Sequence, residues 1–125
     1  MTDKKRRILI VEDEVEMLKA LQLRLEANGY EVLTAQDGLS GLNKARSEKP
    51  DLILLDVMLP KMDGFKICRM LKFDQDYKNI PVIILTAKVQ DSDVEQGLAM
   101  GADAYMTKPY KADELVGKIK ELLGD

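Results

Sequence analysis

Three short, uninterrupted apolar runs constrain the fold of this chain more than any other feature. They are Ile8–Val11, Leu52–Leu55 and Val82–Leu85. Each run has only four residues, which is too short for a buried helix and suits a strand. Because no polar residues alternate with the apolar ones, both faces of each strand must be buried. The runs therefore predict a parallel sheet with helices on both faces.

Helical patterns alternate with these runs and with two weaker strands. We expect the weaker strands at Tyr30 to Ala35 and Ala104 to Thr107. The less apolar of the two, Tyr30 to Ala35, suits an edge of the sheet. The helices are expected through Leu18, Leu21 and Leu25, and over about 38–48, 64–73, 92–100 and 112–123. Alternation at this spacing implies right-handed crossovers. We predict an α/β fold, doubly wound, with five parallel strands in the common order 2-1-3-4-5.

The helix expected from about 92 to 100 is the least well anchored. Ser92 and Glu95 fit a capping box at its start, and Gly101 ends it. Its only clear apolar side chains are Val94 and Leu98. We therefore expect this helix to be the most weakly held.

The composition excludes several kinds of chemistry. The chain has no histidine and one cysteine, Cys68, which removes Ser–His and Cys–His catalysis, His-ligated zinc and an internal disulfide. Cys68 is in register with Phe65 and Leu71 and is expected to be a core thiol. A net charge of −3 and the lack of any long apolar run favour a cytoplasmic protein without nucleic-acid or membrane partners. The basic run Lys4–Arg7 is expected to be a solvated N-terminal arm.

Polar side chains stand at the ends of four of the five predicted strands. Glu12 and Asp13 follow the first strand, Asp56 the third and Lys108 the fifth, and Thr86 ends the fourth. In a doubly wound sheet these carboxyl ends meet at one edge, where ligands bind. We expect Asp13 and Asp56 to face each other across that crevice.

Three carboxylates gathered at one edge repel one another. A pair about 4 Å apart costs on the order of 4 kcal/mol at an effective dielectric near 20. Lys108 supplies one positive charge, and an all-oxygen ligand set favours Mg²⁺ for the rest. A divalent ion, a lysine and a hydroxyl group are also what a phosphoryl group needs. The plainer alternative is an acidic cluster neutralised by Lys108 alone.

Four segments, in their order and spacing, resemble the receiver domain of bacterial two-component response regulators. They are VEDE at Val11–Glu14, LLDVMLPKMDG at Leu54–Gly64, ILTA at Ile84–Ala87 and GADAYMTKPY at Gly101–Tyr110. The resemblance covers essentially the whole chain. It implies a single receiver domain over residues 1–125 with the flavodoxin-like, CheY-like form of the predicted fold.

The resemblance also implies how the acidic residues act. Asp56 would be the phosphoacceptor, which takes a phosphoryl group from the phosphohistidine of a sensor histidine kinase or a phosphotransfer protein. Asp13 and Asp56, with the backbone carbonyl of Met58, would bind Mg²⁺ or Mn²⁺ directly. Glu12 would act on the ion through water.

The remaining roles implied by the resemblance concern the response to phosphorylation. Thr86 and Lys108 would each contact a phosphoryl oxygen, with Ala87 leaving room at the site. Thr86 and Tyr105 would form the switch, Tyr105 turning inward as Thr86 moves, although Tyr105 also suits a core position. The Lys108–Pro109 peptide bond would be cis. The fourth helix, the fifth strand and the last helix would form the face that responds.

Charge partners for a homodimer are only partly present on that face. Asp103, Glu114 and Lys118 fit the pattern of DNA-binding regulators, but Val94 and Ala104 stand where a basic and an acidic residue are expected. We therefore expect a monomer or a weak dimer.

The output and three competing functions complete the expectations. Because the chain ends soon after the last predicted helix, we expect an effector in trans or an output domain in a longer protein. A haloacid-dehalogenase-like phosphatase would need a second acid where this chain has Met58. We thus expect no enzyme beyond a domain that catalyses its own phosphorylation and dephosphorylation. A flavin carrier would need a Ser/Thr/Gly-rich loop after the first strand, which is missing. A binding module that never takes phosphate leaves the full set of acids, hydroxyl and lysine unexplained.

Overall fold

Strands and helices alternate throughout the computed structural model, which describes residues 5–87 and 90–125. In chain order the elements are β1 (Arg7–Val11), α1 (Val15–Ala27), β2 (Glu31–Ala35), α2 (Gly38–Glu48), β3 (Leu52–Leu55), α3 (Gly64–Lys72), β4 (Val82–Thr86), α4 (Asp91–Ala99), β5 (Ala104–Thr107) and α5 (Ala112–Leu123). The predicted succession of strands and helices is confirmed. Within the described residues, no helix combines the length and the apolar character needed to cross a bilayer.

The five strands form one parallel sheet in the order β2-β1-β3-β4-β5, as predicted. β2, the less apolar strand, lies at an edge. Val11 at the end of β1 is level with Ala35 of β2 and Leu55 of β3. Thr86 at the end of β4 is likewise level with Thr107 of β5. This register brings the residues that follow β1, β3 and β5 to the same edge.

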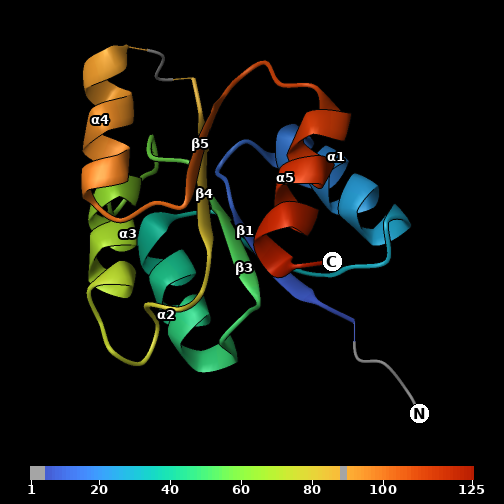
Figure 1. Ribbon diagram of the computed structural model, residues 1–125, viewed down its shortest axis with the longest axis horizontal. Coiled ribbons are helices and arrows are strands. Elements are labelled where there is room, and N and C mark those ends of the chain that lie inside the picture. Colours follow the sequence, from blue (N-terminus) through green and yellow to red (C-terminus); the bar gives the residue numbers. More distant parts are fainter. Residues whose placement is uncertain (1–4, 88–89) are drawn as a thin grey trace.

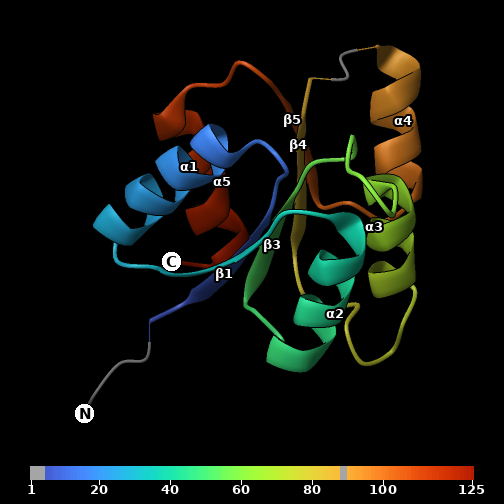
Figure 2. The same cartoon turned by 180° about the vertical axis from the view of Figure 1, so that it is seen from behind.

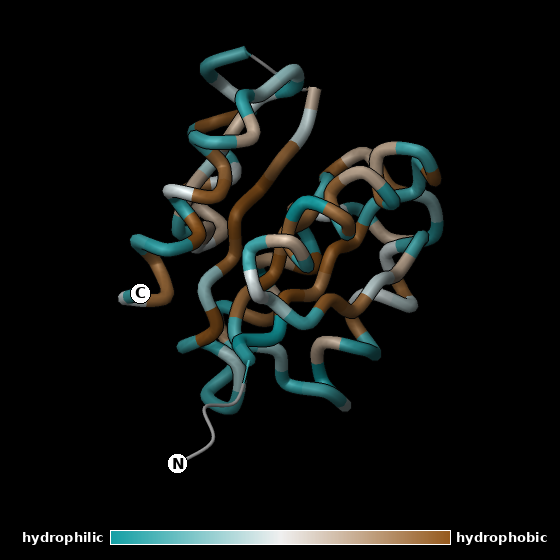
Figure 3. The backbone as a smooth tube through the Cα atoms, turned by 90° about the vertical axis from the view of Figure 1, so that its right-hand side faces the viewer, coloured by the Kyte–Doolittle hydropathy of each residue, from teal (hydrophilic) through white to brown (hydrophobic). Residues whose placement is uncertain are grey.

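Helices cover both faces of the sheet (Figures 1 and 2). α1 and α5 lie on one face, and α2, α3 and α4 lie on the other. Ile8 and Ile10 of β1 pack into the core shared with α1 and α5, whereas Leu9 and Val11 pack into the core shared with α2 and α3. Figure 3 shows the apolar residues running along the central strands. A strand that is apolar at every position is explained by these two cores.

Glycine and aspartate fix the limits of α1 and α2. α1 ends before Gly29, whose φ of +91° is left-handed and favours glycine. The Asp37 carboxylate accepts a hydrogen bond from the Ser40 backbone N–H at 2.8 Å, and this bond lowers the pKa of Asp37. Asp37 therefore caps α2, as predicted.

α4 differs from its prediction in how it begins and how it is anchored. The helix starts at Asp91 after Gln90, and no side chain caps it. Ser92 lies inside the first turn, so the predicted capping box is wrong. Leu98 is 51% exposed and is not an anchor. The buried residue of α4 is Gly97, so the helix meets the sheet through a position without a side chain.

Two arginines at the start of the described chain make ion pairs with acidic side chains. Arg7 belongs to β1, and its guanidinium donates to Glu31 at 2.9 Å and to Glu48 at 2.6 Å. Arg6 pairs with Asp125 at 3.2 Å. The prediction of a solvated arm is therefore wrong at Arg7, whereas Lys5 and Arg6 are exposed, and Lys4 lies outside the described residues.

Candidate functional site at the carboxyl edge of the sheet

A lysine and two carboxylates from three strand ends meet at the carboxyl edge. The Lys108 ammonium donates to Glu12 Oε1 at 2.6 Å and to Asp56 Oδ2 at 2.9 Å. Glu12 is 3% exposed and Asp56 is 6% exposed. The structure thus brings together, in a buried cluster, residues that lie 96 and 52 positions apart from Lys108 in the sequence.

The backbone around Asp56 fixes the direction of its side chain. Its own N–H donates to the Val11 carbonyl at 3.1 Å, which continues the pairing of β1 with β3. Its Oδ1 accepts a hydrogen bond from the Met58 N–H at 2.9 Å. One oxygen is therefore held by the loop after β3 and the other by Lys108, so the carboxylate cannot rotate freely.

Burial and charge act in opposite directions on the pKa values of the cluster. Burial raises the pKa of Glu12, and the hydrogen bonds from Lys108 and from the Glu14 N–H offset this only in part. Burial lowers the pKa of Lys108, but its bonds to Glu12 and Asp56 outweigh burial and leave the pKa raised. The Glu12–Lys108 hydrogen bond thus contributes to outweighing burial in the pKa of Lys108 but does not outweigh it in the pKa of Glu12. The reason is that two buried carboxylates share one ammonium.

Asp13 adds a third carboxylate at the exposed rim of the cluster. Glu12, Asp13 and Asp56 each offer one oxygen, and these oxygens lie within 4.8 Å of one another. With metal–oxygen distances of about 2.1 Å, adjacent ligands of an octahedral Mg²⁺ lie about 3.0 Å apart and opposite ligands about 4.2 Å apart. Oxygens this close can be bridged by one ion, directly or through its water ligands, and hard oxygen donors suit Mg²⁺ or Mn²⁺.

Thr86 lies beside this cluster at the end of β4 and is fully buried. Its carbonyl accepts a hydrogen bond from the Lys108 N–H at 2.9 Å, so the two residues are locked together through the backbone. Ala87, the next residue, is exposed. The Lys108–Pro109 peptide bond is cis, the isomer that the resemblance implies.

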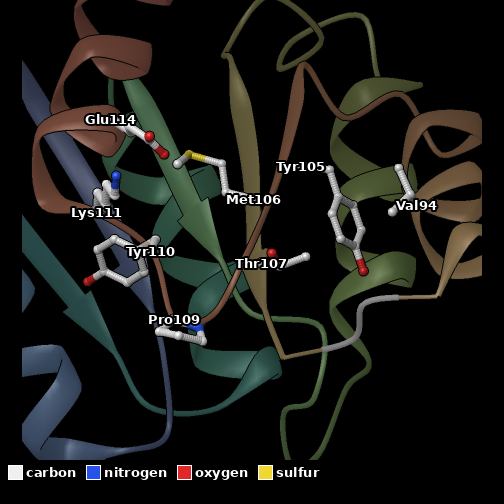
Figure 4. Close-up of a pocket in the computed structure, with 8 residues that line it drawn as sticks. All are labelled: Val94, Tyr105, Met106, Thr107, Pro109, Tyr110, Lys111 and Glu114. Carbon is white, nitrogen blue, oxygen red and sulfur yellow. The ribbon is translucent and has the colours of Figure 1, made fainter.

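Tyr105 lies on β5, level with Ile84 of β4, and is partly buried. Its ring contacts a small core that includes Phe65, and burial raises the pKa of its hydroxyl. Figure 4 shows the ring between β5 and Val94 of α4. A Cβ added at Gly97 would lie 2.8 Å from the ring. Tyr105 is therefore packed directly against α4, and its predicted movement on phosphorylation stays a prediction.

A hollow of about 580 Å³ lies between α4, β5 and α5 and is lined by Val94, Tyr105, Met106 and Glu114, among others (Figure 4).

The charges expected on this face are partly engaged within the chain. Asp103 accepts hydrogen bonds from Lys72 at 2.9 Å and from the Val82 N–H at 2.8 Å. An aspartate bound in this way is less available to a partner.

Two glycines that support the site were not identified as site residues from the sequence. A Cβ added at Gly64 would lie 2.3 Å from the Asp56 carbonyl oxygen, and one added at Gly38 would lie 2.0 Å from the Met62 carbonyl oxygen. The available signal was a glycine at the first helical position after an aspartate cap, in both α2 and α3. Such a position rarely needs glycine for the helix itself.

Comparison with known proteins places residues 8–120 within the family model for the response regulator receiver domain. The alkaline phosphatase synthesis transcriptional regulatory protein PhoP of Bacillus subtilis is 48% identical over 118 residues. The match covers 94% of this chain and 48% of PhoP. The chain thus spans about half the length of the curated relatives it matches.

Solved structures agree in fold. The signal receiver domain of a histidine kinase from Syntrophus aciditrophicus has a TM-score of 0.89 and 39% identity, and the match covers 95% of this chain and 90% of that one. The receiver domain of a sensor histidine kinase from Pseudomonas aeruginosa has a TM-score of 0.89 and 30% identity, with 98% and 100% covered. In that protein a magnesium ion is coordinated in the active-site cleft.

Proposed function

Since the chain belongs to the receiver-domain family of two-component response regulators, we propose that it accepts a phosphoryl group on Asp56. The donor would be the phosphohistidine of a sensor histidine kinase or of a phosphotransfer protein. The observation that carries this proposal is the Asp56 carboxylate, held between the Met58 N–H and the Lys108 ammonium next to two further carboxylates. A nucleophile fixed in this way is already oriented for attack.

The chemical step is a transfer between two nucleophiles. A carboxylate oxygen of Asp56 forms a bond to phosphorus while the bond from phosphorus to the donor imidazole nitrogen breaks. The electron pair leaves with the imidazole. Lys108 neutralises part of the negative charge that collects at the edge, and its flexible ammonium can follow a phosphoryl oxygen without leaving the cluster.

We further propose that Mg²⁺ is bound by Asp13, Asp56 and the Met58 backbone carbonyl, with Mn²⁺ as a substitute. A bound divalent ion would neutralise the phosphoryl oxygens. Glu12 would act through water, and its bond to Lys108 supports this indirect role, because one of its oxygens is already committed. The exposed position of Asp13 supports direct access to an ion from solvent.

We propose Thr86 and Tyr105 as the switch. Phosphorylation adds a charge of about −1.5 to −2 at the edge, and the Thr86 hydroxyl would move towards it. Converting a mostly inactive population into a mostly active one requires about 5.5 kcal/mol of preference. The contact of Tyr105 with Gly97 supports α4 as the element that follows, since little else of α4 is buried.

The name of the Bacillus subtilis relative, a transcriptional regulatory protein, supports a transcriptional output, on the same chain or in trans. We propose no direct contact between this domain and nucleic acid, and no enzymatic activity beyond its own phosphorylation and dephosphorylation. The engaged Asp103 supports a monomer or a weak dimer. Sedimentation before and after phosphorylation measures the dimer affinity directly.

Intact-mass spectrometry tests the proposal. The protein is incubated with acetyl phosphate and Mg²⁺, and the wild type is compared with Asp56→Asn and with the exposed control Asp76→Asn. We expect one added phosphoryl group on the wild type and on the control, and none on Asp56→Asn. Equal labelling of Asp56→Asn would show that Asp56 is not the acceptor.

A further inference from the structure

The loop between β3 and α3 is tied to the first residue of α2. The Pro60 carbonyl accepts a hydrogen bond from the Gly38 N–H at 3.0 Å and a second from the Met62 N–H at 2.8 Å. The first N–H groups of a helix have no partner within the helix. Here the loop that follows Asp56 supplies one, so α2 and the loop are joined through their backbones.

This junction exists only because residue 38 has no side chain. A Cβ added at Gly38 would lie 2.0 Å from the Met62 carbonyl oxygen and 2.7 Å from its carbon. These are backbone atoms, which no change of rotamer can move away. At its other end the loop is confined by Gly64, whose N–H donates to the Val57 carbonyl at 3.2 Å.

We propose that Gly38 is a positioning residue for divalent metal binding, because it sets the place of the loop that carries the Met58 carbonyl. This inference rests on the proposed function, in which Met58 and Asp56 hold Mg²⁺. Mg²⁺ requires near-ideal octahedral geometry at about 2.0–2.1 Å. A Cβ at residue 38 would start 2.0 Å from the Met62 oxygen and must be at least 3.0 Å from it, so the helix or the loop would have to shift by about 1 Å. Loss of an outer-shell partner that orients a metal ligand reduces affinity about 10- to 100-fold, and we take this as the scale for a displaced Met58 carbonyl.

The test compares Gly38→Ala with Gly41→Ala on the same helix. A Cβ at Gly41 would also be crowded, at 2.7 Å, but against the Val11 side chain and not against the loop. Mg²⁺ affinity is measured by calorimetry on chelator-treated protein, and circular dichroism establishes that each variant is folded. We expect at least about a tenfold loss of affinity for Gly38→Ala and an affinity near that of the wild type for Gly41→Ala.

Phosphorylation with acetyl phosphate provides a second readout. For Gly38→Ala the Mg²⁺ concentration for half-maximal labelling of Asp56 should rise by the same factor, while labelling at saturating Mg²⁺ should reach the wild-type level. A merely destabilised protein would instead lose labelling at every Mg²⁺ concentration. If Gly38→Ala does not fold, Pro60→Gly loosens the same loop, because the proline ring fixes the φ of the residue whose carbonyl accepts both hydrogen bonds. It should bind Mg²⁺ more weakly than the wild type.

Two results would overturn the inference while leaving the proposed function intact. One is wild-type Mg²⁺ affinity in Gly38→Ala, or in Pro60→Gly where that variant replaces it. The other is an equal loss of affinity in Gly38→Ala and Gly41→Ala. A wild-type protein that binds no Mg²⁺ and is not labelled on Asp56 would overturn the proposed function and this inference with it.

Discussion

Replacing Asp13 by alanine should stabilise the metal-free protein and remove its response to Mg²⁺. Lys108 is bound to Glu12 and Asp56, which leaves Asp13 as the carboxylate of the cluster without that contact. Its oxygen nevertheless lies within 4.8 Å of theirs. In the absence of an ion, Asp13 therefore adds repulsion to the folded state that the unfolded chain largely escapes.

The size of this repulsion follows from the distance. Two unit charges 4.8 Å apart repel by about 3.5 kcal/mol at an effective dielectric of 20, and by about 0.9 kcal/mol in bulk water. Asp13 is exposed, and Lys108 cancels part of the charge it meets, so the lower half of this range applies. We expect Asp13→Ala to gain about 1–2 kcal/mol, which raises the melting temperature by several degrees in a domain of this size.

Thermal unfolding in chelator and in Mg²⁺ measures both effects. At a Mg²⁺ concentration of about 100 times its Kd, the wild type should gain about 2.7 kcal/mol, and Asp13→Ala should gain little. The control is Asp76→Ala, which makes the same charge change at an exposed position outside the cluster. The reasoning is refuted if Asp13→Ala is no more stable in chelator than Asp76→Ala, or if it keeps the wild-type gain from Mg²⁺.

Three further predictions concern two helical glycines, Glu12 and Lys108. Gly117→Ala adds a Cβ with nothing within 4 Å and should stabilise the protein by about 1 kcal/mol. Gly97→Ala brings the same gain in helix propensity, but its Cβ meets the Tyr105 ring, so the protein should lose about 1 kcal/mol or more of stability. Equal stabilisation by both substitutions in urea unfolding would contradict this. Because burial raises the pKa of Glu12, the folded protein keeps a proton that the unfolded chain has lost, so in chelator stability falls as pH rises from about 4.5 through the higher folded pKa. Glu12→Gln should flatten this slope in unfolding measured from pH 4 to 7, and an unchanged slope would count against the assignment. Lys108→Met leaves two buried carboxylates without their cation and should lower stability in chelator by about 3 kcal/mol, partly restored by Mg²⁺; an unchanged unfolding midpoint would be the contrary result.

The fold could be predicted because its signals repeat along the chain. Runs such as Leu52–Leu55 are apolar at every position, and only burial on both sides explains this pattern. The weaker apolar character of β2 then placed it at an edge, which the structure confirms. These signals depend on several residues at once, so a single exception does not alter the result.

Predictions that depended on one or two residues failed more often. The sequence predicts Leu98 as an anchor of α4 because it is one of only two clear apolar side chains there, but two residues do not define a face of a helix. Gly97 faces the sheet instead, because the Tyr105 ring occupies the space that a larger side chain would need. Ser92 is not the cap, because the helix begins one residue before it, at Asp91.

The site was predictable to the extent that it is built from strand ends, and no further. Parallel strands carry their terminal residues to one edge, so Glu12, Asp13, Asp56 and Lys108 could be grouped from the sequence alone. A count of charges gives three acids and one lysine, but it does not say which acid the lysine leaves uncompensated. The structure shows Lys108 bound to the two buried carboxylates, at 2.6 and 2.9 Å. The exposed Asp13 is therefore the acid whose charge must be met from solution, and for this reason its replacement separates metal binding from folding.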